Sequence, residues 1–170
     1  MEAKLTLTKS VKTAAPVSLR SCKTTAPKMT NIETTAEAYL ELLAARGVDY
    51  LFANAGTDFA PIIEAYARRK KLSLPAPKPM LVAHETVAVA MAHGYGMVTG
   101  RAQAVMVHVI VGLANALCGV INAARGNVLM LMTAGRTPIT ESDFLGCRDR
   151  PIHWAQESFG QGGSSRLKSG

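Results

Sequence analysis

An α/β fold, a three-layer α/β/α domain with a mainly parallel sheet, is predicted by three features of this 170-residue sequence. Helical patterns alternate with short apolar runs in the order α-β-α-β-α-β-α-β. The runs are apolar almost throughout, as expected of strands that are covered on both faces. The connections are short, which suits right-handed crossovers. Because 48% of the residues are hydrophobic and only 18% are charged, full disorder is excluded.

The first helix is predicted by a capping box. Thr34 and Glu37 have the spacing at which each side chain caps the other residue's backbone N–H group. Gly47 follows the last turn and suits a helix C-terminus. Residues 48–53 form an apolar run that predicts a short buried strand, and residues 54–56 predict the turn that follows it.

The second helix is predicted to begin after residues Thr57 and Asp58, which can cap it, and Pro61 is tolerated in its first turn. Residues 68–71 are all cationic. Cations are favoured at the negative end of the helix dipole, so we expect this cluster to be a solvated helix terminus.

The later elements include residues 102–124, a stretch without any charged residue. Polar and glycine residues interrupt this stretch, and its first half is β-branched whereas its second half is rich in alanine. A strand followed by a buried helix is therefore favoured over a membrane span. The expected elements are a strand at 80–83, a helix at 85–98, a strand at 104–109, a helix at 113–124 and a strand at 128–132.

The charge is concentrated at the N-terminus. Residues 1–30 have a net charge of +5 and the other 140 residues have +2, so the body lacks the basic surface that a nucleic acid partner needs. We expect residues 1–30 to be a disordered or targeting tail. The three cysteines are too few for a disulfide scaffold. A cytoplasmic location follows, and the basic, Ser/Thr-rich tail alone supports the alternative of an organelle.

Polar residues collect where the predicted strands end, at residues 54–57, 84–85, 108–115 and 133–136. In an open parallel sheet, ligands bind outside the carboxyl ends of the strands. We therefore expect a site at this edge. The sequence contains neither a P-loop motif nor a dinucleotide-binding glycine motif after a strand.

Glu85 is the most informative of these residues, because it opens a helix that has no other charge before Arg101. A structural interpretation is that an acidic residue in the first turn stabilises the helix dipole. A functional interpretation is that a carboxyl at a dry sheet edge exchanges a proton with a ring nitrogen of a ligand. Spacing alone leaves both interpretations open.

Eight segments of the sequence match one known family in order and without large gaps: Thr35–Leu40, Ala53–Phe59, His84–Glu85, Met91–Tyr95, Gly112–Asn115, Asn122–Arg125, Thr133–Pro138 and Ile152–Glu157. Through these segments, residues 31–162 resemble the N-terminal, pyrimidine-binding domain of thiamine-diphosphate-dependent enzymes of the acetolactate synthase family. The resemblance is specific.

The resemblance implies a role for each matching residue. Glu85 takes the place of the glutamate that hydrogen-bonds a ring nitrogen of the aminopyrimidine and so activates the cofactor for attack on a 2-keto acid. Gly112 and Asn115 are implied to lie beside the cofactor. The implied substrate-cleft candidates are Asn54, Gly56, His84 and Gln156.

A second domain is also implied, because family members bind magnesium and the diphosphate through a G-D-G segment that this sequence lacks. We expect no metal site on this chain, a divergent and truncated C-terminus at residues 163–170, and no activity from this chain alone. FAD cannot be assigned. We expect this chain to form a homo-oligomer or to assemble with a chain that carries the diphosphate-binding domain. The expected substrate is a small 2-keto acid. The alternatives are the small subunit of a two-chain 2-keto acid decarboxylase, or a non-catalytic dimerising remnant.

Overall fold

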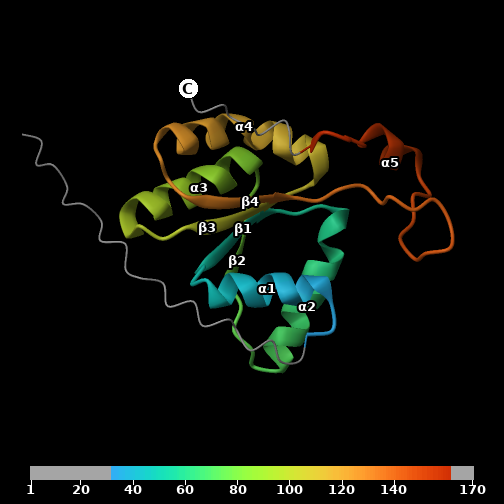
Figure 1. Ribbon diagram of the computed structural model, residues 1–170, viewed down its shortest axis with the longest axis horizontal. Helices are drawn as coiled ribbons and strands as arrows, with labels where there is room; N and C mark the ends of the chain where they lie inside the picture. Colours follow the sequence, from blue (N-terminus) through green and yellow to red (C-terminus); the bar gives the residue numbers. More distant parts are fainter. Residues whose placement is uncertain (1–31, 162–170) are drawn as a thin grey trace, which may run out of the picture.

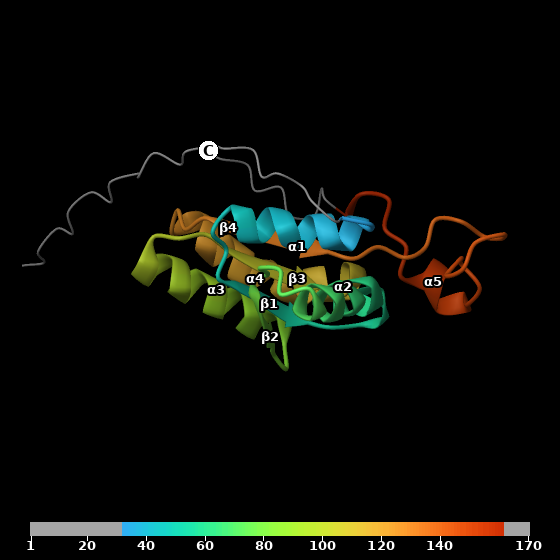
Figure 2. The same cartoon turned by 90° about the horizontal axis from the view of Figure 1, so that it is seen from below.

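The computed structural model describes residues 32–161, which form three layers (Figures 1 and 2). The predicted N-terminal tail and the predicted divergent C-terminus lie outside the described residues. The middle layer is a four-stranded sheet in the order β2-β1-β3-β4, and every pair of neighbours is parallel. The strands are β1 (Tyr50–Asn54), β2 (Lys78–Leu81), β3 (Gln103–Val107) and β4 (Met130–Ala134). The predicted fold class is confirmed.

Helices cover both faces of the sheet (Figure 1). On one face α1 and α2 pack against side chains such as Leu51 and Met106. On the other face α3 and α4 pack against Phe52, Val105 and Val107. Successive residues of a strand point to opposite faces, which is why the apolar runs supply two cores. The helices are α1 (Thr35–Ala45), η1 (Thr57–Phe59, a 3₁₀ turn), α2 (Ala60–Lys71), α3 (Glu85–Thr99), α4 (Val109–Arg125) and α5 (Pro151–Ala155).

The capping box at the start of α1 is confirmed. The Thr34 hydroxyl accepts a hydrogen bond from the Glu37 backbone N–H at 3.2 Å, and the Glu37 carboxylate accepts one from the Thr34 N–H at 3.2 Å. Gly47 has a φ of +73° just after the helix, a conformation that costs glycine little.

The end of α2 corrects one prediction, because the cationic cluster is only partly solvated. Arg69 is 2% exposed. Its Nε donates to the Pro75 carbonyl at 2.9 Å, and its guanidinium pairs with Glu41 of α1. Arg68 pairs with Glu37, also of α1. The two arginines therefore join α1 to α2, which the dipole argument did not anticipate because the partners are distant in the sequence.

The beginnings of two helices also differ from prediction. Phe59, not Thr57 or Asp58, is the N-cap of α2, and no side chain caps it. The helix α4 begins at Val109 rather than at residue 113, and β3 ends at Val107. Val109 has a φ of +38°, and this turn ends the strand inside an apolar run in which hydrophobic periodicity gives no boundary.

The predicted strand-then-helix division of the uncharged stretch is confirmed by β3 and α4. Within residues 32–161, no helix combines the length and the apolar character that crossing a bilayer requires.

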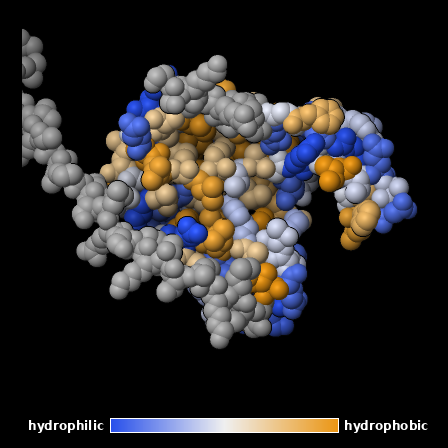
Figure 3. Space-filling view, in the orientation of Figure 1, coloured by the Kyte–Doolittle hydropathy of each residue, from blue (hydrophilic) through white to orange (hydrophobic). Residues whose placement is uncertain are grey.

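The two edges of the sheet have different chemistry. The edge strand β2 begins with Lys78 and Pro79, two residue types that discourage further strand pairing. The other edge strand, β4, has the sequence MLMTA and exposes Leu131, with Leu129 exposed just before it. Figure 3 shows the molecule in the orientation of Figure 1, and apolar residues gather on the face in view where β3 and β4 lie. The β4 edge is therefore the one that is suited to a neighbour.

Candidate functional site

Glu85 lies at the carboxyl edge of the sheet as the first residue of α3. The helix begins there because His84 is its N-cap, with an extended backbone and with Nδ1 accepting a hydrogen bond from the Thr86 N–H at 3.2 Å. Glu85 is 7% exposed. The short connection from β2 thus places a nearly buried carboxyl at the sheet edge.

Two other predicted residues join Glu85 from the first turns of α4. The Asn115 side-chain amide donates to Glu85 Oε2 at 3.1 Å. Gly112 faces the same carboxylate, since a Cβ added at Gly112 would lie 3.2 Å from Glu85 Oε1 and 3.0 Å from the Val107 side chain. Three residues from two helices therefore converge at one point.

The remaining oxygen of Glu85 is available to a ligand. Oε1 makes no hydrogen bond within residues 32–161, and it does not belong to the buried unpaired atoms of that range. A carboxyl that is held at one oxygen and open at the other can bind and exchange a proton with a ring nitrogen. The residues present thus fit the aminopyrimidine ring that the sequence implies. A carboxylate that served the helix dipole alone would need no partner from a second helix.

Replacing Gly112 with alanine should destabilise the protein by about 1–3 kcal/mol, because the added methyl group crowds Val107 and Glu85. Gly94→Ala is the matched control, since Gly94 lies in α3 with no heavy atom within 4 Å of its added Cβ. That substitution should stabilise the protein by about 0.5–1 kcal/mol through helix propensity. Denaturant unfolding of both variants measures the difference, and equal effects would contradict the close approach at Gly112.

The predicted substrate-cleft candidates occupy four different settings. The Asn54 side chain donates to the Val82 carbonyl at 3.0 Å and so ties β1 to the segment after β2. His84 is half exposed, with its Nδ1 3.9 Å from Glu85 Oε2. Gly56 precedes η1. Gln156 is the C-cap residue that follows α5, which projects from the end of the molecule where η1 lies (Figures 1 and 2). Within the described residues, no hydrogen bond joins Gln156 to the Glu85 group.

The segment around Gln156 is fixed by an ion-pair network. Glu157 accepts hydrogen bonds from Arg136 at 3.1 Å and from Arg148. Burial alone would raise the pKa of Glu157, but the hydrogen bonds from Arg148 and Arg136 hold it below its ordinary value. Arg148 also lies over the Trp154 ring, 5.6 Å from its centroid. These contacts hold the irregular chain after β4 together.

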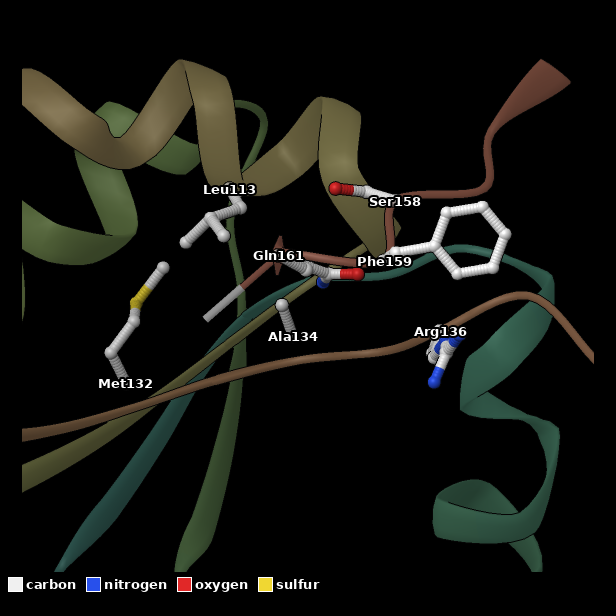
Figure 4. Close-up of a pocket in the computed structure, with 7 residues that line it drawn as sticks. All are labelled: Leu113, Met132, Ala134, Arg136, Ser158, Phe159 and Gln161. Carbon is white, nitrogen blue, oxygen red and sulfur yellow. The ribbon is translucent and has the colours of Figure 1, made fainter. Parts of the chain in front are cut away.

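A cavity of about 370 Å³ lies between the start of α4, the end of β4 and the segment after α5. Figure 4 shows Leu113 of α4 facing Met132 and Ala134 of β4, with the Phe159 ring pointing away from Gln161. Glu85, Gly112 and Asn115 do not line this cavity. Its lining consists of Leu113, Met132, Ala134, Arg136, Ser158, Phe159 and Gln161.

One pair at this edge was not identified from the sequence. His108 Nδ1 lies 2.6 Å from Asp58 Oδ1, and both side chains are largely buried. Asp58 was expected to cap α2, and His108 was only one of several polar residues after β3. The signal that could have found the pair is the glycine on each side of it, Gly56 and Gly135, because close backbone approach requires glycine.

Comparisons of this chain with a protein family and with individual proteins agree with one another. Residues 33–163 match the family described as "Thiamine pyrophosphate enzyme, N-terminal TPP binding domain". The chain is 36% identical to the IlvX protein of Mycobacterium tuberculosis, provisionally named an acetolactate synthase large subunit, over 59% of this chain and 18% of that protein. It is 31% identical to the acetolactate synthase large subunit of Haemophilus influenzae, over 69% of this chain and 21% of that protein.

A solved structure agrees in fold. The thiamine diphosphate-dependent 4-hydroxybenzoylformate decarboxylase of Rhodococcus jostii RHA1 superposes with a TM-score of 0.55 and 30% identity, over 63% of this chain and 19% of that one. The chain thus spans about one fifth of the length of the curated relatives it matches. The match covers more than half of this sequence, and the chain belongs to the thiamine pyrophosphate enzyme family, in which it corresponds to the N-terminal TPP binding domain.

Proposed function

We propose that this chain binds the aminopyrimidine ring of thiamine diphosphate as part of an acetolactate-synthase-like enzyme that acts on 2-keto acids by decarboxylation or carboligation. The observation that carries the proposal is the group formed by Glu85, Asn115 and Gly112. A relative named as an acetolactate synthase large subunit and a solved structure named as a 4-hydroxybenzoylformate decarboxylase support the substrate class.

Each residue of the group has a defined task in this proposal. Glu85 holds and exchanges a proton at Oε1, the oxygen that Asn115 leaves free. Asn115 orients the carboxylate, and Gly112 leaves room for a flat ring beside it. When bound, the cofactor supplies an electron sink for the bond that a 2-keto acid breaks as it loses carbon dioxide.

The diphosphate and magnesium belong, in this proposal, to a second domain. The relatives are about five times as long as the matched segment, which leaves ample chain for such a domain. That domain comes either from the rest of a longer protein, in the same or in a second copy of it, or from a separate chain. The small-subunit alternative predicts a separate chain, and the non-catalytic alternative predicts an assembly without turnover.

The face of α3 supports a partner at this position. Along one side of the helix, Val87, Met91 and Val98 are exposed at spacings of one turn or two, together with Gly94. On the neighbouring helix α4, Val111 and Ile121 are exposed as well. Exposed apolar residues on two neighbouring helices beside the proposed site are typical of an interface.

Met91→Asp should therefore prevent assembly with the partner, because it places an unpaired charge in an apolar interface. Met91 is 37% exposed, and Ile63→Asp on α2 is the matched control because Ile63 is 59% exposed on the opposite face. The measurement is the mass and the thiamine diphosphate content of the assembly purified from its source cells through a tag on this chain. We expect the wild type and Ile63→Asp to retain partner and cofactor, and Met91→Asp to lose both. A wild-type assembly without thiamine diphosphate would overturn the proposed function.

A further inference from the structure

The contact between His108 and Asp58 joins the start of α4 to η1, and the two residues are 50 positions apart in the sequence. His108 is the N-cap residue of α4, but its side chain makes no capping hydrogen bond. Instead its Nδ1 lies 2.6 Å from Asp58 Oδ1. This is the short distance that is typical of a charge-assisted hydrogen bond.

Two glycines enclose the pair so tightly that a side chain at either position would displace a member of the pair. A Cβ added at Gly56 would lie 2.2 Å from His108 Nδ1, and one added at Gly135 would lie 1.6 Å from Asp58 Oδ2. Asp58 Oδ2 is buried and has no hydrogen-bond partner within residues 32–161. The backbone at the ends of β1 and β4 thus fixes both members of the pair.

The backbone next to His108 is strained. Val109 is β-branched and has a φ of +38°, a conformation that is strained for such a residue and persists only where the surroundings determine it. The turn at Val109 places His108 at the carboxyl edge, one helical turn before Gly112 of the Glu85 group. Strain of this kind collects at functional sites.

We infer that Asp58 is a positioning residue that holds His108 in the tautomer protonated at Nδ1 and keeps its Nε2 as the free, reactive nitrogen. Nε2 makes no hydrogen bond within the described part of the chain. In the imidazolium form, which Asp58 stabilises, Nε2 donates a proton to the keto oxygen of a substrate as that carbonyl is attacked, and the neutral Nε2 takes the proton back when the carbonyl re-forms. The substrate step rests on the proposed function, whereas the tautomer does not.

Nitrogen chemical shifts of the ¹⁵N-labelled 170-residue chain test the inference, measured in long-range ¹H–¹⁵N spectra at a pH where the ring is neutral. A His108→Gln variant assigns the signals. We expect His108 to be protonated at Nδ1 in the wild type. In Asp58→Ala the proton should shift toward Nε2, and in Asp58→Asn it should stay at Nδ1, because the amide oxygen can still accept it.

Gly135→Ala is a second, independent variant, which displaces the carboxylate without removing it and should reproduce the effect of Asp58→Ala. Circular dichroism establishes that each variant is folded, and the two Asp58 variants decide the question if Gly135→Ala does not fold. A wild-type ring protonated at Nε2, or a tautomer unchanged by Asp58→Ala, would overturn the inference. Neither result bears on thiamine diphosphate binding, because the spectra are recorded without cofactor.

Discussion

Glu85→Gln should lower the turnover of a 2-keto acid by the assembled enzyme by about 10²–10⁴-fold, the usual contribution of a positioned acid–base group. Glutamine occupies the same space and can keep a polar contact with Asn115, but it cannot exchange a proton at the atom that replaces Oε1. The assembly should therefore still form. The measurement is the release of carbon dioxide from a 2-keto acid, with thiamine diphosphate content determined on the same samples.

Glu64→Gln is the matched control for this experiment, because Glu64 is an exposed acid on α2 and its loss changes the net charge equally. Turnover by that variant should equal that of the wild type. Wild-type turnover in Glu85→Gln would show that the proposed acid–base role is wrong. A wild-type assembly that binds the cofactor but turns over no 2-keto acid would favour the non-catalytic alternative instead.

The order of the elements was predictable because its signals are local. The capping box at Thr34 and Glu37 lies within one helical turn, and each strand contains a short apolar run. A parallel sheet then follows from the short crossovers. The positions of the strand ends were less accurate: β1 begins at Tyr50 rather than at residue 48, because an apolar run does not mark where hydrogen bonding begins.

The candidate site also contains residues that the sequence predicted and residues that it did not predict. Glu85, Gly112 and Asn115 were assigned from a specific resemblance, and the fold brings them together. Spacing alone could not have chosen between a catalytic and a dipole-related role for Glu85. The pair of His108 and Asp58 was not predicted, because its contact depends on the strained turn at Val109. No local sequence pattern predicts that turn.

Arg69 was misassigned for a related reason. A run of four cations at a helix end is usually solvated, and the dipole argument treats all four alike. The fold distinguishes them, since Arg69 reaches Glu41 across the interface between α1 and α2. Long polar side chains take their roles from tertiary neighbours, and a single sequence does not contain those distances.

Gln103→Met should destabilise the fold by about 2–5 kcal/mol, a large part of the stability of an ordinary domain. Gln103 is 0% exposed at the amino end of β3. Its Oε1 accepts hydrogen bonds from the backbone N–H groups of Asp49 at 3.1 Å and Tyr50 at 2.8 Å, and its Nε2 donates to the Ala102 carbonyl at 2.9 Å. Methionine has a similar length, so the loss arises from unpaired backbone groups rather than from a cavity.

Gln161→Met is the matched control, since the side chain of Gln161, which is partly exposed, makes a single hydrogen bond within residues 32–161, to the Gly135 carbonyl at 2.9 Å. It should cost no more than about 1 kcal/mol in denaturant unfolding. Gln103 lies at the amino edge of the sheet and Glu85 at the carboxyl edge. The Gln103→Met enzyme that remains folded at low temperature should therefore turn over substrate at the wild-type rate. A stable but inactive Gln103→Met variant would show that the two edges are coupled, and it would contradict a site built only at the carboxyl ends of the strands.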